Sequence, residues 1–306
     1  MNSVLDIKLF CLYTACYICK EVFMPKVSVL TPIYNTNPKH LRECIESILN
    51  QTFKDFEFLI LNDSPDNKEI ENIVKEYAKQ DKRVKYYKNE KNMGITPSRN
   101  KLLGLASGEY VAIFDHDDIS LPDRLEKEVY ILDNNPEIGA VSGWLELFEC
   151  KKENSLHICP EYDFEIKCTM TRGCWFPHTA SMLRKSVLDK NNIRYESCYT
   201  PCEDFQLWNR LMDVTQFYCI QSVVVRYRNF SGNTTHRTKK IMDKIHAMIC
   251  ADVSGRYPGH EKWFKRYSNL AGTSFRLRLG PIPLLKIKNN KIYLFEIIPV
   301  FKMLWR

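Results

Sequence analysis

The stretch Glu109–Asp118 reads EYVAIFDHDD, an apolar run that ends in three carboxylates. Such a run is typical of a buried strand in a parallel sheet, and Pro122 predicts the first turn of a following helix. Because side chains alternate along a strand, Asp115 and Asp117 are expected on one side, where a hard divalent cation can bridge them to phosphate oxygens. For this stretch taken alone, an acidic solvated turn that binds nothing is the plain alternative.

Strand and helix patterns alternate around this stretch from Lys26 onward. Short apolar runs predict strands at 27–31, 56–61, 84–87 and, beyond the regular alternation, at 140–148, 179–183 and 217–227. Apolar residues at helical spacing predict helices between the first strands, as at Leu41, Cys44, Ile45, Ile48 and Leu49. This order predicts an α/β fold with a mainly parallel central sheet and helices on both faces.

Polar residues follow the predicted strands at their carboxyl ends. Tyr34 follows the first strand, Asp63 the second, and Asn92 with Gly94 the third. Open parallel sheets bind ligands at this edge. The pattern therefore predicts that a nucleotide spans it.

A second pair of acids, Glu203 and Asp204, precedes apolar residues at helical spacing. At a helix start the dipole favours anions, so capping is the simplest interpretation of the pair alone. With a metal-binding motif upstream, a catalytic role for this pair of acids becomes the competing interpretation.

The 306-residue chain is long enough for one large domain with appendages. Met24 directly precedes the first convincing strand, which favours a translation start there, and residues 1–23 are set aside as an N-terminal extension. The 12 cysteines show no regular spacing, which indicates a reducing, cytoplasmic compartment. Cys16 and Cys19 form a CxxC without a second pair, so buried thiols are favoured over zinc.

The C-terminal residues 258–306 carry ten Lys or Arg against Glu261 and Glu296, and two similar segments, 281–287 and 297–303. Apolar residues mixed with lysines predict a basic amphipathic tail lying on an anionic membrane surface, at the inner face of the cell membrane. A basic strand pair packed on the domain is an equal alternative. The aromatics match no nucleic-acid-binding module, so no nucleic-acid partner is expected.

Together these motifs resemble the family 2 glycosyltransferases, inverting enzymes of the GT-A fold with a Rossmann-like sheet, over residues 27–227. The similar segments are Val27–Asn35, Asn62-Asp63, Asn92-Met93-Gly94 with Arg99-Asn100, Asp115–Asp118, Glu203-Asp204 with Leu207-Trp208, and Tyr227–Phe230. Two departures stand out: Asn62 replaces the family's first Asp, and Phe230 replaces an expected His. Whether His236 substitutes for that His is open.

The resemblance implies a role for each matching residue. Asp117 would be the main metal ligand, with Asp115 assisting it, and Mn²⁺ or Mg²⁺ the metal. Asp204 would be the general base. The donor or acceptor would be bound by residues spread over both halves of the domain, namely Pro32, Tyr34, Asp63, Asn92, Gly94, Arg99, Asp118 and Glu203.

The expected function is metal-dependent transfer of a sugar from a nucleoside diphosphate, with UDP favoured, to a glycan or lipid-linked oligosaccharide of a bacterial surface polysaccharide. Residues 24–136 would form the nucleotide-sugar half and residues 137–257 the acceptor half of a 24–257 domain. The alternatives are a GT-A-like protein that binds nucleotide or glycan without turnover, and a nucleotidyltransferase. The second acid pair argues against both, since neither needs a base as well as a metal site.

Overall fold

The computed structural model describes residues 24–149, 155–230, 238–268, 276–279, 282–288 and 291–294. The first half alternates strands and helices: β1 (Val27–Ile33), α2 (Pro38–Leu49), β2 (Phe56–Asn62), α3 (Lys68–Gln80), β3 (Val84–Lys88), α4 (Ile95–Leu105) and β4 (Tyr110–Ile113). These four strands pair in parallel in the order β3-β2-β1-β4. The predicted parallel sheet is therefore confirmed for the half that contains EYVAIFDHDD.

The second half widens the same sheet with longer and more varied connections. Its elements are β5 (Ile119–Ser120), α5 (Arg124–Asn134), β6 (Ile138–Phe148), β7 (Ser155–His157), α6 (Asp163–Met170), β8 (Met182–Arg184), α7 (Lys185–Lys190), a 3₁₀ turn at Ser197–Tyr199, α8 (Glu203–Leu211) and β9 (Gln216–Arg228). The sheet continues as β4-β8-β6-β9-β5, with β7 on β6. β6 and β9 are parallel, whereas β8 pairs antiparallel with β4 and β6.

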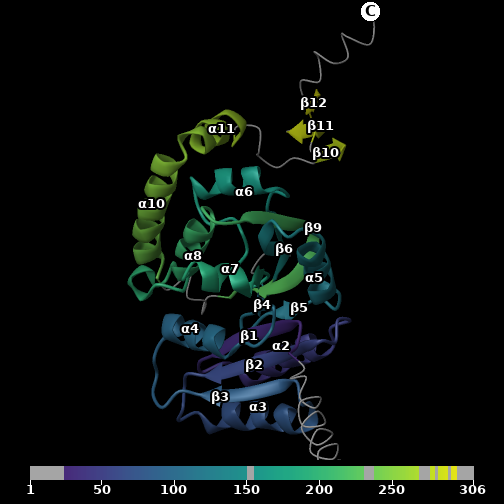
Figure 1. Cartoon of the computed structure of the whole chain (residues 1–306), viewed down its shortest axis with the longest axis vertical. Helices are drawn as coiled ribbons and strands as arrows, with labels where there is room; N and C mark the ends of the chain where they lie inside the picture. Colours follow the sequence, from purple (N-terminus) through teal and green to yellow (C-terminus); the bar gives the residue numbers. More distant parts are fainter. Residues whose placement is uncertain are drawn as a thin grey trace, which may run out of the picture.

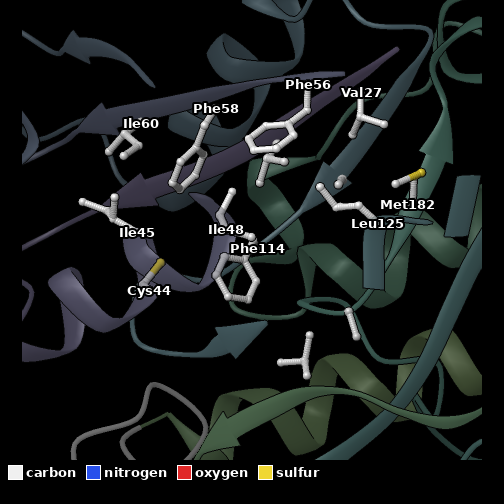
Figure 2. Close-up of a cluster of buried hydrophobic side chains, with 14 of the residues drawn as sticks. Val27, Cys44, Ile45, Ile48, Phe56, Phe58, Ile60, Phe114, Leu125 and Met182 are labelled. Atoms are coloured by element: carbon white, nitrogen blue, oxygen red, sulfur yellow. The ribbon is translucent and has the colours of Figure 1, made fainter. Parts of the chain in front are cut away.

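Helices cover both faces of the sheet (Figure 1). Along β4, Tyr110 and Ala112 face one apolar core while Val111 and Ile113 face the other, as the two-residue period of a strand requires. Figure 2 shows the first core, in which Cys44, Ile45 and Ile48 of α2 lie against phenylalanines of β2. Helices α2, α3 and α5 pack on this face, and α4, α6, α7 and α8 on the other.

Two local predictions need correction. Pro122 does not lie in the first turn of α5, because the helix begins at Arg124 with Asp123 at its N-cap. The strand expected at 179–183 covers only Met182–Arg184, and Thr179, where it was expected to begin, bonds the acid cluster instead.

After β9 come α10 (Lys239–Arg256) and α11 (Pro258–Ser268). The region predicted as a basic tail thus begins with a helix that contacts α6, and its Glu261 pairs with Arg172, in the turn after α6, at 3.1 Å. Further on, β10 (Arg276–Leu279), β11 (Ile282–Lys288) and β12 (Lys291–Leu294) form a separate antiparallel sheet. Residues 1–23, His236 and the second similar segment, 297–303, lie outside the described residues.

Within the described ranges, no helix combines the length and the apolar character needed to cross a bilayer.

Candidate active site

The acid cluster after β4 is held by hydrogen bonds from two distant segments. The N–H of Asp115 donates to Thr179 Oγ1 at 3.1 Å, and the Thr179 hydroxyl donates to Asp118 Oδ2 at 2.8 Å. Asp118 Oδ1 accepts from the N–H of Arg228 at 2.9 Å. Asp118 is fully buried with both oxygens bonded, so its side chain positions the cluster in this structure.

Arg228, at the end of β9, fixes the backbone of the same cluster. Its Nε donates to the carbonyl of Asp117 at 2.7 Å, and its Nη2 bonds Glu43 at 2.5 Å. It also pairs with Glu149. The sequence shows Arg228 only as part of the segment Tyr227–Phe230, which by itself indicates no role for it. Phe230, which replaces the expected His, lies against the His40 ring at 6.1 Å.

Asp115 and Asp117 have partly accessible carboxylates, with 30% and 19% of their side chains exposed. Burial raises the pKa of Asp117, with His116 opposing and Asp115 adding to the rise. Burial alone would also raise the pKa of Asp115, but the positive charge of Arg99 lowers it.

Hard carboxylate oxygens suit Mg²⁺ or Mn²⁺, so these two side chains fit a divalent cation. The described residues place no third His, Cys, Asp or Glu close enough to complete such a site. A cation held here would therefore take its remaining ligands from water and from a bound phosphate group.

Arg99 of α4 joins this cluster to the second acid pair. Its Nη1 donates to Glu203 Oε1 at 2.7 Å and its Nη2 to Asp115 Oδ1 at 3.1 Å. Its guanidinium also lies 5.6 Å from the centre of the Tyr195 ring. One side chain thus touches both acid groups, which places them in a single site.

The second acid pair begins α8, as the sequence predicts. Glu203 is buried and bonded to Arg99, and its Oε2 has no hydrogen-bond partner among the described residues. Asp204 is less buried, and its Oδ1 accepts from the N–H of Phe205 at 2.7 Å. Burial raises the pKa of Asp204 above its ordinary value, although Arg99 and the Phe205 N–H oppose the rise. A carboxylate with a raised pKa is suited to accept a proton.

The residues predicted to bind nucleotide meet at the carboxyl ends of β1, β2 and β3. Asp63 is buried and accepts from the N–H groups of Met93 and Gly94, each at 2.8 Å. Asn92 also accepts from the Gly94 N–H, at 2.9 Å. Gly94 has a φ of 87°, which favours glycine at this turn before α4.

Pro32 and Tyr34 complete this edge. Pro32 is buried inside β1, whereas Tyr34, just past the strand, is 50% exposed. Only the tyrosine of the two offers a side-chain surface to a ligand in this structure.

His178 is packed against Tyr195 and Trp208. Its Nε2 lies 2.9 Å from the Tyr195 hydroxyl, and its ring lies 5.7 Å from that of Trp208. Burial, assisted by the charge of Arg99, lowers the pKa of His178 to about 3, so the ring is neutral at pH 7. Neither Tyr195 nor Thr179 belongs to a motif that sequence reasoning could have identified.

The twisted, mostly parallel sheet and the acid residues at its edge define a GT-A-type glycosyltransferase architecture. Residues 28–191 match the family described as glycosyl transferase family 2. The chain belongs to this family.

Two relatives illustrate the similarity. An uncharacterized glycosyltransferase of Methanocaldococcus jannaschii is 38% identical over 211 residues, which cover 68% of this chain and 72% of the relative. An uncharacterized glycosyltransferase of Haemophilus influenzae is 30% identical over 223 residues, which cover 69% of this chain and 67% of that relative.

Solved structures share the fold. Residues 1–349 of S. aureus TarS in complex with UDP-GlcNAc match with a TM-score of 0.61 and 17% identity, over 81% of this chain and 76% of that one. The mannosyltransferase PcManGT of Pyrobaculum calidifontis, in complex with GDP-Man and Mn²⁺, matches with a TM-score of 0.55 and 15% identity. The match covers 87% of this chain and 83% of the mannosyltransferase. The predicted fold and family are confirmed.

The Arg99 bridge leads to a stability prediction. Arg99→Met removes the positively charged side chain that pairs with Glu203 and Asp115. Because the Arg99 side chain is only 12% exposed, we expect the free energy of unfolding to fall by about 3–5 kcal/mol. Urea denaturation measures this change.

Arg42→Met is the matched control. Arg42 pairs with Glu76 at 3.0 Å, but the two side chains are 42% and 50% exposed. Such a surface pair contributes at most about 1 kcal/mol. Equal losses in the two variants would show that the Arg99 bridge does not stabilise the site.

Proposed function

We propose that this glycosyltransferase is metal-dependent and inverting, and that it moves a hexose or an N-acetylhexosamine from UDP to a hydroxyl of a glycan or lipid-linked oligosaccharide. The observation that carries the proposal is the bridge by Arg99 between Asp115 and Glu203. It links Asp115, one of the two carboxylates suited to a cation, to Glu203, the neighbour of Asp204, whose carboxylate is suited to be a base. UDP is favoured because the similar TarS structure holds UDP-GlcNAc.

Asp204 acts as the general base in this proposal. It would take the proton from the acceptor hydroxyl as the oxygen attacks the anomeric carbon, and its raised pKa supports that transfer. Attack opposite the leaving group inverts the configuration, so the base and the diphosphate lie on opposite sides of the sugar, by analogy with inverting hydrolases.

Asp115 and Asp117 would hold the divalent cation, Mn²⁺ or Mg²⁺. When bound, such a cation neutralises the charge that builds up on the leaving diphosphate. Arg228 and Asp118 keep the cluster in place, and Arg99 sets the position of Asp115 relative to Glu203.

At the other end of the donor, Asp63 and the 92–94 turn would form the base-binding edge. Asp63 fixes this turn through two backbone N–H groups. Tyr34, exposed beside it, would contact the nucleotide base.

We further propose that the protein works in the cytoplasm, at the inner face of the cell membrane. The eight cysteines whose side chains the structure describes are all free thiols, which suits a reducing compartment. The basic residues of 258–306 supply the charge for association with anionic lipid.

A donor panel tests the proposed function. The protein is incubated with Mn²⁺ and each common sugar nucleotide, and release of the nucleoside diphosphate is measured with and without candidate acceptors. We expect turnover with one or more UDP-sugars. Nucleotide binding with no turnover of any donor would show a non-catalytic binder instead.

A further inference from the structure

A cavity of about 350 Å³ lies between α10 and the turn that follows α6. It is lined by Thr171, Arg172, Asp243, His246, Ala247 and Cys250. This volume is in the lower part of the range of small-molecule sites, about 300–1,000 Å³. None of these residues belongs to the motifs that carry the proposed chemistry.

The cavity adjoins the start of α8, where Asp204 lies. The ring of His246 is 5.1 Å from that of Phe205, whose N–H is bonded to Asp204. On the other side of the acid pair, the thiol of Cys202 lies 3.7 Å from the carbonyl of Met242. The cavity-bearing part of α10 thus contacts the residues that flank the acids, and Figure 1 shows α10 alongside α8.

The groups that line the cavity are polar and carry no excess of positive charge. Arg172 is the cation, and it also pairs with Glu261 of α11 at 3.1 Å. Asp243 is the anion, and burial lowers the pKa of His246, so its ring is neutral at pH 7. Neither the Asp243 nor the His246 side chain hydrogen-bonds another residue in the part of the chain that the structure describes. A site without excess positive charge, and with side chains left to hydrogen-bond, suits an uncharged polyhydroxyl ligand better than a phosphate.

The loop that follows the lining residues Thr171 and Arg172 carries an exposed aromatic side chain. Trp175, three residues after Arg172, is 39% exposed, and its ring lies 6.4 Å from that of Phe264. Burial and then the charge of Asp204 raise the pKa of the adjacent Cys174, so this loop runs close to the acid pair. Exposed aromatic faces beside polar groups can stack on the apolar faces of a sugar ring.

We propose that this cavity binds the acceptor, and that the acceptor ends in an uncharged sugar that Arg172, Asp243 and His246 hydrogen-bond and Trp175 contacts. The inference rests on the proposed glycosyl transfer and adds the chemical class of the acceptor. The hydroxyl to be glycosylated would then project from the cavity toward Asp204.

The test compares acceptor kinetics in cavity variants. The acceptors are neutral p-nitrophenyl glycosides of glucose, galactose, mannose and N-acetylglucosamine, with p-nitrophenyl glucuronide and glycerol phosphate as charged alternatives. Asp243→Ala and His246→Ala each remove a hydrogen-bonding group, so we expect the acceptor KM to rise about tenfold. Ala247→Phe, which fills the cavity, should raise it further. Hydrolysis of the donor without acceptor should stay within about twofold of the unmodified protein.

Lys244→Ala is the matched control, because Lys244 is exposed on α10 between two lining residues but does not line the cavity. Three results would overturn the inference: an acceptor KM that no cavity variant changes, transfer to the charged acceptors alone, or donor hydrolysis without transfer to any neutral glycoside. Failure of the unmodified protein to turn over any sugar nucleotide would instead reject the proposed function.

Discussion

Asp204→Asn lowers the rate of sugar transfer by about 10²–10⁴-fold, the usual contribution of a general base. The amide has nearly the same size as the carboxylate but cannot take the acceptor proton. Affinity for UDP should be unchanged, because the groups expected to hold UDP lie after β1–β4 and not on α8. Single-turnover transfer and calorimetric UDP binding measure the two effects.

The pH dependence provides an internal control. Because the pKa of Asp204 is raised, transfer by the unmodified protein should fall as the pH drops through a value above the ordinary Asp pKa of about 4. The residual rate of the Asn variant should not show that decline. Asp66→Asn, at an exposed position away from both acid groups, should behave like the unmodified protein. Full transfer activity in Asp204→Asn would remove this residue from the base role.

Asp117→Ala should abolish transfer and also weaken UDP binding in the presence of Mn²⁺. We expect a loss of affinity of at least about 100-fold, since even residues that only support a metal ligand typically contribute 10–100-fold. Calorimetric titration of the protein with UDP, with and without Mn²⁺, measures the loss.

Removal of the metal distinguishes a ligand from a structural residue. EDTA should reduce UDP affinity in the unmodified protein to the level of Asp117→Ala, and should change the variant little. Asp123→Ala is the control, because Asp123 lies in the same loop region but pairs with Lys127 at the surface. If EDTA weakened UDP binding equally in Asp117→Ala and in the unmodified protein, Asp117 would not be the ligand.

The central fold could be predicted because its signals are local. Strands β1, β2 and β4 alternate between two apolar cores, and α2 repeats its apolar residues at helical spacing. By contrast, β8 has three residues and β5 two, so both are too short to show the alternation of apolar and polar residues that marks a strand. Their places in the sheet depend on partners far along the chain, which the sequence does not indicate.

The residues of the candidate site can likewise be predicted from the sequence only where their signals are local. Asp117, Asp115 and Asp204 belong to compact motifs, so the sequence alone is enough to nominate them as candidates. The side chains that organise them act across long separations: Arg99 bonds a residue 104 positions away, and Arg228 one 111 positions away. Such contacts follow from tertiary packing, so the positioning roles of Arg99 and Arg228 emerged only from the structure.

The two cores on opposite faces of the sheet also bear on how this protein can be altered. Ile249 and Val253 anchor α10 in the core that holds α8, whereas α2 and α3 contribute to the other core. Mutations at sites without shared partners usually have additive effects on stability. A designer could therefore rebuild the surface of α10 to accept a new sugar, and separately retune α2 and α3 for thermal tolerance, without each change undoing the other.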